Sequence, residues 1–123
     1  VAIGKRNKLK IEKVDVVVNF GKIINPDIVL SQVEGSVVMG ISGALKEEIT
    51  FHDGRVSQSN YDDYRISRMK DCPDINVTII ESDEDVRGID GSLMPILPAI
   101  TNAIYAATGK RIRRLPIGKQ KLI

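Results

Sequence analysis

A long helical pattern interrupted by glycine, in residues 24–49, constrains the fold of this chain more than any other stretch. Asn25 is a favourable N-cap residue and Pro26 suits the first position of a helix, so the sequence predicts a helix that begins there. Apolar residues then recur at the spacing of one helical face: Val29, Val33, Val37, Ile41 and the pair Ala44 and Leu45. The pattern therefore predicts a helix of about five turns with one buried face.

The unusual feature of this predicted helix is its glycines. Gly35, Gly40 and Gly43 lie inside it, and each costs about 0.8–1 kcal/mol relative to alanine. Ser36, Gly40 and Gly43 share a face that carries almost no side-chain volume. Either this face packs closely on a sheet or a second helix, or part of it lies against a large flat ligand, because glycine allows close approach to the backbone. In the second case Gln32 would supply directional polar contacts.

The composition is that of one ordinary globular domain. A length of 123 residues is enough to bury a core, so we predict a single domain spanning 1–123. The net charge of +2 is too small to attract nucleic acid, and no uninterrupted apolar run approaches the roughly 20 residues that cross a bilayer. We therefore predict neither a nucleic-acid partner nor membrane insertion.

Metal ligands are scarce in the sequence. The chain has one cysteine, Cys72, and one histidine, His52, which lie far apart. These are too few for a cysteine-ligated iron–sulfur cluster or for a zinc site built by this chain. We therefore predict no protein metal ligand here and no functional role for either residue.

Alternating apolar residues predict strands on both sides of the helix. Residues 9–18 alternate with a change of phase near Glu12, which indicates a bulge or bend, and Val17 is expected to be buried with its neighbours. The Asp53–Gly54 pair predicts a hairpin between two short strands. Residues 75–79 alternate cleanly and predict another strand.

The last third of the chain predicts a second helix. Residues 96–107 carry apolar side chains on one face, and Gly109 stands where a C-cap glycine belongs. The basic run 110–114 contains no interleaved aromatic residue, so it predicts a solvated or interface-facing edge strand better than a nucleic-acid patch. Residues 57–70 are polar and irregular. Three of their side chains are expected to anchor this region onto the core: Tyr61, Tyr64 and Met69. Together the elements predict an α+β fold, a mostly antiparallel sheet with two main helices packed on it.

Three segments in a fixed order carry a family resemblance: NPDIVLSQVEGSVVMGISGAL, DGRV and PILPAITNAIYAATGKRIRRLP. Together they resemble the C-terminal end of the large subunits of molybdenum hydroxylases, the superfamily of xanthine dehydrogenases and aldehyde oxidoreductases. Gln58, Ser59, Asn60 and Tyr64 add a nearer resemblance to the beta subunits of isoquinoline 1-oxidoreductases. Such subunits are several hundred residues long, so the resemblance implies that this chain is a C-terminal fragment of one.

The resemblance implies an oxidoreductase that hydroxylates an N-heterocycle or an aldehyde with water as the oxygen source. Its cofactor would be molybdopterin, in the cytosine dinucleotide form, and its partners would be the remainder of the large subunit and an iron–sulfur small subunit. The isolated chain is expected to be inactive and to bind no molybdenum, because it is too short to enclose such a cofactor. The alternative is a catalytically silent scaffold or interaction module that kept the fold.

In this family a glutamate at the end of a Gly-Val-Gly-Glu run accepts the proton during hydroxylation. The chain has Gly-Ile-Asp-Gly-Ser at residues 88–92 instead. Counting back from Pro95 and Pro98 puts Asp90 in the place of the glutamate, with a side chain one methylene shorter. Counting forward from the start of the run puts Gly91 there and leaves no base. Asp90 could also be an ordinary turn residue beside glycine.

The resemblance also implies cofactor-binding residues. Gln32 matches the glutamine that opens a Gln-x-Glu-Gly run, where the family brings this helix near the pterin. Its amide can donate and accept hydrogen bonds at a pterin edge, although a plain structural amide is the alternative. Gly91 and Ser92, beside the position of the base, complete the predicted cofactor-binding set.

Overall fold

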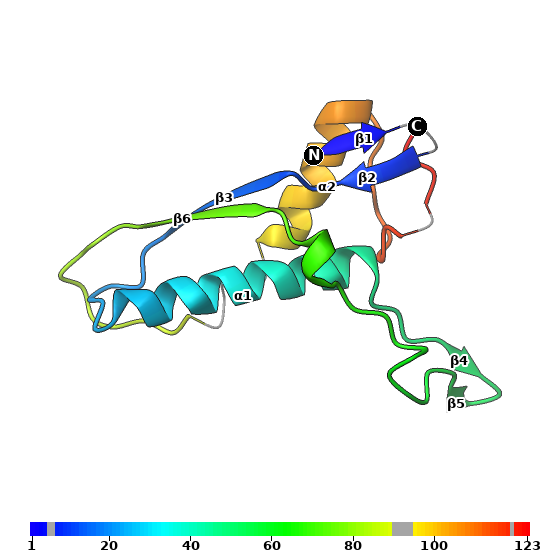
Figure 1. The fold of residues 1–123 in the computed structure, drawn as a ribbon, viewed down its shortest axis with the longest axis horizontal. Coiled ribbons are helices and arrows are strands. Elements are labelled where there is room, and N and C mark those ends of the chain that lie inside the picture. Colours follow the sequence, from blue (N-terminus) through cyan, green and yellow to red (C-terminus); the bar gives the residue numbers. More distant parts are fainter. Residues whose placement is uncertain (5–6, 90–94, 119) are drawn as a thin grey trace.

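The computed structural model describes residues 1–4, 7–89, 95–118 and 120–123 (Figure 1). The elements follow the chain in this order: β1 Ala2–Gly4, β2 Lys8–Lys10, β3 Lys13–Val18, α1 Pro26–Leu45, β4 Phe51–His52, β5 Arg55–Val56, the 3₁₀ turn η2 Met69–Asp71, β6 Asp74–Ile79 and α2 Ile96–Thr108. In the part of the chain that is described, the strands form three two-stranded sheets, β1–β2, β3–β6 and β4–β5. The α+β class and the two main helices are thus as predicted.

The prediction of a mostly antiparallel sheet is wrong. The two longest strands, β3 and β6, pair in parallel, in a register that runs from Lys13 opposite Asp74 to Val18 opposite Ile79. Parallel strands need a long crossover connection, and here α1 and the β4–β5 hairpin lie within it. The alternation of apolar residues has the same period in either direction, so the sequence pattern could not distinguish the two arrangements.

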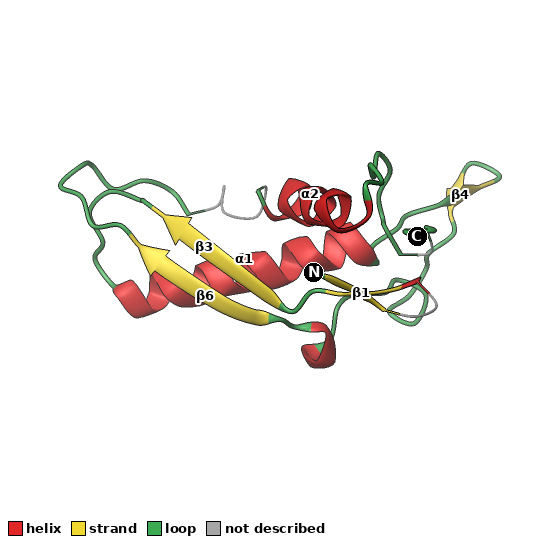
Figure 2. Ribbon diagram, turned by 90° about the horizontal axis from the view of Figure 1, so that it is seen from above, coloured by secondary structure: helices red, strands yellow, loops and turns green. Residues whose placement is uncertain are grey.

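The main core lies where α1 meets α2 and the strands (Figure 2). α2 contributes a stripe at a spacing of four residues, Ile96, Ile100 and Ile104, each at most 6% exposed. The other buried residues of the core come from several parts of the chain: Ile11, Val37, Ile41, Ala44, Ile117 and Leu122. The helical spacing read from the sequence therefore identified the buried faces of both helices.

The start of α1 and the end of α2 are as predicted. The Asn25 side chain accepts a hydrogen bond from the backbone N–H of Ile28 at 3.2 Å, and α1 begins at Pro26. α2 ends at Gly109, whose φ of 72° lies in the left-handed region that favours glycine. These boundaries are set by local chemistry, which explains why the sequence was enough to find them.

Several predictions of burial and of secondary structure are wrong. Val17 is 64% exposed, since alternate side chains of β3 point away from the core. Tyr61 and Met69 are 97% and 95% exposed and do not anchor their region, whereas Tyr64 is half-buried. Residues 110–114 form no strand in the structure.

The predicted hairpin is present as an arm that extends away from the rest of the fold (Figure 1). Phe51 and Val56 face each other across its two strands and are 73% and 47% exposed. An isolated two-stranded hairpin is only marginally stable in water. The arm is therefore the part of the described chain with the least packing of its own.

Residues near the two ends of the chain are joined through one side chain. The Asn7 amide donates to the backbone oxygen of Gln120 at 2.7 Å, and its oxygen accepts from the backbone N–H of Leu122. Leu122 is buried in the main core. The segment after α2 is thus held against the β1–β2 hairpin.

α1 is the one helix of the described chain that is long and apolar enough to cross a membrane by length and composition. The sequence of α1 is not an uninterrupted apolar run, because serine, glycine and polar residues lie within it. In the fold 44% of its most apolar window is buried, as in the core helix of a globular domain. Length and composition alone are therefore weak evidence for a membrane span.

Candidate functional site

The predicted site residues fall into two groups. Gln32 lies on α1 and is exposed. Asp90, Gly91 and Ser92 lie outside the described residues. The structure therefore gives the surroundings of Gln32, and the chain segment that leads to the other three.

Gln32 belongs to an exposed face of α1. Ile28, Gln32, Gly35 and Met39 follow one another at spacings of three or four residues, so they share this face, and all four are exposed. A Cβ added at Gly35 would meet no atom within 4 Å. The face thus combines an accessible carboxamide with an uncovered stretch of helix backbone.

The small-residue face of α1 has two parts. Ser36 and Gly40 are buried, as close packing requires, and the Ser36 hydroxyl donates to the backbone oxygen of Gln32 at 2.8 Å. Gly43 is half-buried, and a Cβ there would meet no atom within 4 Å. The prediction of a buried face is therefore confirmed for Ser36 and Gly40 and is wrong for Gly43.

The segment before residue 88 is held by the turn that follows β3. Three backbone hydrogen bonds join it to residues 18–22: Ile80 N to Val18 O (2.8 Å), Lys22 N to Glu84 O (2.9 Å) and Arg87 N to Phe20 O (2.8 Å). The β3–β6 pairing is in this way continued past the ends of both strands. The path of the chain toward residues 88–92 is therefore set by residues 18–22.

Two residues make this turn possible. The Asn19 side-chain oxygen accepts from the backbone N–H of Gly21 at 3.0 Å and from the Ser82 hydroxyl at 3.1 Å. Gly21 has a φ of 76° and lies against the backbone of Asp85. An asparagine two residues before a glycine was the available sequence signal, since such asparagines commonly bond their own backbone two residues on.

The chemistry of the exposed face of α1 fits one edge of a pterin. An amide offers both donors and acceptors, and the open backbone at Gly35 leaves room for a flat ring to approach. Gln32 lines neither of two hollows formed by described residues, so this face borders neither of them. Among the described residues, no group of three or more His, Cys, Asp or Glu side chains could hold a metal ion.

Comparison with known proteins agrees with this chemistry. The family model of the molybdopterin cofactor-binding domain matches residues 5–73, which is more than half of the chain. Isoquinoline 1-oxidoreductase subunit beta of Brevundimonas diminuta is 38% identical over 112 residues, which cover 90% of this chain and 14% of that protein. The xanthine dehydrogenase molybdenum-binding subunit of Escherichia coli O157:H7 is 32% identical over 123 residues, which cover 94% of this chain and 16% of its own length. The chain thus spans only a small part, 14% and 16%, of these two curated relatives.

A solved structure shares the fold. Quinoline 2-oxidoreductase from Pseudomonas putida 86 superposes with a TM-score of 0.81 at 25% identity, over 93% of this chain and 16% of that one. The superposition therefore extends over nearly the whole chain. By its sequence and its fold, the chain belongs to the molybdopterin cofactor-binding domain family of the molybdenum hydroxylases, the superfamily of xanthine dehydrogenases and aldehyde oxidoreductases.

Proposed function

We propose that this chain is the C-terminal domain of a larger molybdenum hydroxylase that oxidises an N-heterocycle or an aldehyde with oxygen from water. The observation that carries the proposal is the family match together with the exposed Gln32–Gly35 face of α1. The names of two similar proteins, an isoquinoline and a quinoline oxidoreductase, favour an N-heterocycle as the substrate.

The proposed role of α1 is to form one wall of the cofactor site. The Gln32 amide would bond polar atoms at the edge of the pterin, and Gly35 would let the ring lie close to the helix. When bound, the cofactor supplies the oxygen-transfer and electron-accepting chemistry, and we propose its cytosine dinucleotide form. Gly91 and Ser92 are proposed to contribute further contacts from the neighbouring loop.

Asp90 is the proposed proton acceptor. A carboxylate suits this role if it reaches the proton to be removed and has a pKa near the working pH. Aspartate is one methylene shorter than the family glutamate, and a misplacement of 1 Å can cost about 10²-fold in rate. The stretch of chain from Ile80 to Arg87, bonded to residues 18–22, would set the position from which Asp90 must reach.

The remainder of the large subunit is the proposed partner of two exposed apolar side chains, Ile24 and Phe51. They are 84% and 73% exposed, and we propose that the larger subunit covers them. An iron–sulfur small subunit is proposed as the electron acceptor. Since α1 offers a single wall, we expect the isolated chain to be inactive and to bind no molybdenum.

The second candidate is a scaffold that retained the fold without catalysis. It is favoured by one observation, the aspartate or glycine that stands where the family has glutamate. Under this hypothesis the complete protein would load cofactor but would not turn over any heterocycle or aldehyde.

The experiment that tests both candidates uses the complete protein, loaded with cofactor and assayed with a panel of N-heterocycles and aldehydes. Asp90→Asn should lower turnover by about 10²–10⁴-fold, the usual effect of losing a general base, at unchanged molybdenum content. Asp83→Asn, an exposed carboxylate in the preceding loop, is the matched control. Full turnover in Asp90→Asn would mean that Asp90 is a turn residue. A loaded protein without any turnover would support the scaffold.

A further inference from the structure

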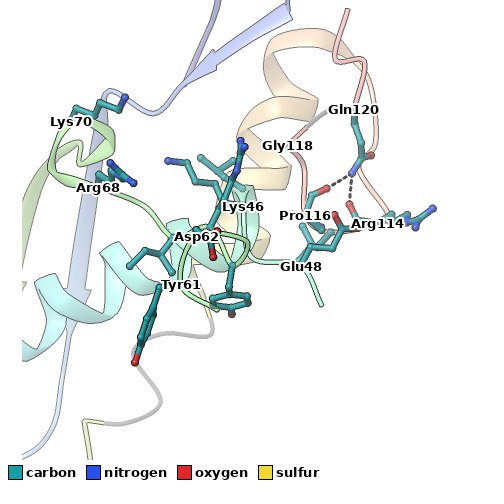
Figure 3. A pocket seen from close by; sticks show the side chains of 15 residues that line it. Lys46, Glu48, Tyr61, Asp62, Arg68, Lys70, Arg114, Pro116, Gly118 and Gln120 are labelled. Carbon is teal, nitrogen blue, oxygen red and sulfur yellow. Dashed lines mark hydrogen bonds between the residues drawn. The ribbon is translucent and has the colours of Figure 1, made fainter. Parts of the chain in front are cut away.

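A groove of about 900 Å³ lies at the C-terminal end of α1, on a part of the surface that the proposed function does not use (Figure 3). One wall is the irregular segment of residues 61–70, and the other is the segment of residues 114–120. The end of α1 and the residues just after it, Leu45, Lys46 and Glu48, lie between the two walls. The groove is open along one side, so a ligand could enter without unfolding either wall.

The first wall is fixed to the C-terminal end of α1 and to the two residues that follow it. Three interactions join the two: Ser67 N to Ser42 Oγ (2.8 Å), Tyr64 OH to Glu47 Oε2 (3.0 Å) and the Lys46–Asp71 ion pair. The hydrogen bond from Lys46 holds the pKa of the Asp71 carboxyl below its usual 3.8, so this carboxyl is charged at neutral pH. This wall is therefore attached at several points along its length.

The second wall is attached to the same turn of α1. Ile117 N donates to Ala44 O at 2.7 Å, and Gly118 N donates to Leu45 O at 3.1 Å. The Gln120 amide then closes the segment on itself by donating to the backbone oxygens of Arg114 and Pro116 (Figure 3). Both walls thus depend on the last turn of one helix, which makes the groove a built surface of the fold.

The groove is basic. Its lining includes five cationic side chains, Lys46, Arg65, Arg68, Lys70 and Arg114, and two acidic ones, Glu48 and Asp62. Lys46 is paired with Asp71, whereas the other four cations form no ion pair with any residue that the structure describes. The groove therefore presents more positive charge than its own carboxylates neutralise.

The lining is also partly apolar. Ile66 and Leu115 are 57% and 41% exposed on opposite walls, and Tyr61 is 97% exposed at the rim. The apolar side chains suit a phosphate backbone poorly, because they give it nothing to bond. Carboxylates spaced along an extended peptide, with an apolar side chain between them, match both features of the lining.

From this match we propose that the groove binds an acidic segment of a separate polypeptide in an extended conformation. Its carboxylates would bond Arg65, Arg68 and Arg114, and an apolar side chain between them would lie against Ile66 and Leu115. The acidic loop of this chain, residues 81–85, cannot reach it, because part of that loop lies beside Pro26 at the opposite end of the 20-residue α1, about 30 Å away. The proposal does not depend on the proposed oxidoreductase activity.

The test uses the complete protein and a short fluorescein-labelled peptide of glutamate and aspartate around one phenylalanine, followed by fluorescence anisotropy. Binding should weaken at least about tenfold in an Arg65→Glu, Arg114→Glu double variant, because charge-assisted hydrogen bonds are lost and repulsion is added. The matched control is Arg55→Glu, Arg113→Glu. Arg113 is exposed and adjacent to Arg114 but does not line the groove, and Arg55 lies on the distant hairpin. The control should bind the peptide as the unmodified protein does.

Further measurements keep the outcome clear. Thermal unfolding checks that each variant folds, and Arg65→Gln with Arg114→Gln gives a milder test should charge reversal disturb folding. Equal weakening in the control pair, equal binding of a glutamine and asparagine version of the peptide, or no binding at all would overturn the proposal. The proposal would also be overturned if inorganic pyrophosphate or a DNA oligonucleotide displaced the labelled peptide at lower concentrations than the unlabelled peptide does. Self-association of the protein that disappears in the groove variant would assign the groove to a second copy instead.

Discussion

The backbone oxygen of Asp85 lies 2.1 Å from the position that a Cβ on Gly21 would occupy. No real Cβ atom tolerates such a contact with a backbone atom, so the turn after β3 and the loop after β6 can meet only if residue 21 has no side chain. This contact lies beside the hydrogen bonds that lead the chain toward residues 88–92.

Gly21→Ala should therefore lower the free energy of unfolding by more than about 1 kcal/mol, the range expected when alanine is forced to a positive φ. Gly54→Ala separates the two causes, because Gly54 has a similar φ of 73° but no atom within 4 Å of its added Cβ. Urea unfolding should show a clearly smaller loss at position 54. Equal losses at the two positions would mean that the contact with Asp85 contributes nothing.

Two glycines of α1 should respond in opposite directions. Gly40 is buried, so Gly40→Leu should cost at least about 2 kcal/mol through overpacking. Gly35 is exposed with open space around it, so Gly35→Ala should stabilise the isolated chain by about 0.8–1 kcal/mol through helix propensity. Thermal unfolding of both variants checks the pair. A neutral Gly40→Leu would show that this face of the helix is not closely packed.

The Asp71 carboxyl should contribute to the acid stability of the fold. Its pKa is lowered in the folded state, first by the hydrogen bond from Lys46 and then by the backbone N–H of Arg68. The folded protein thus binds this proton less readily than the unfolded chain, so the stabilisation is present above the usual pKa of 3.8 and is lost as the pH falls through the folded value. Asp71→Asn should lower the free energy of unfolding at neutral pH. This free energy should then fall less steeply than in the unmodified protein as the solution is made acidic. Unfolding curves of Asp71→Asn and of Asp83→Asn, a carboxylate of the exposed loop, would show whether the effect is specific.

If the proposed function is correct, Gln32→Ala should reduce the cofactor content of the complete protein while its unfolding temperature remains unchanged, because the side chain is exposed. Ser31→Ala, at an exposed neighbouring position of the same helix, should have normal content. Molybdenum analysis of both purified proteins checks this. Full occupancy in Gln32→Ala would make the residue a surface amide without a role in cofactor binding.

The sequence predicted those features of the fold that depend on neighbouring residues. Asn25 and Gly109 determine helix boundaries through bonds and dihedral angles within a few positions, so both boundaries could be found without the structure. The direction of β6 relative to β3 and the exposure of Val17 depend on which segments meet in space. Periodicity alone contains no information about either.

The same distinction holds for the sites. Gln32 could be selected from its position in a motif, and the structure adds that its face is exposed. The role of Asp90 stays a prediction. The basic groove was missed because its walls, residues 61–70 and 114–120, are distant in sequence and meet only at the end of α1. Of the basic run at residues 110–114, only Arg114 lines the groove.

The contact between Asn7 and Gln120 joins residues that are 113 positions apart. At a translation rate of about 5–20 residues per second, Gln120 is added to the growing chain roughly 6–23 seconds after Asn7. During that interval β1, β2 and the core face of α1 have no α2 stripe and no Leu122 to cover them. The apolar surfaces of this part of the chain therefore stay uncovered for several seconds of synthesis, and it is during this period that we expect the nascent chain to need a chaperone.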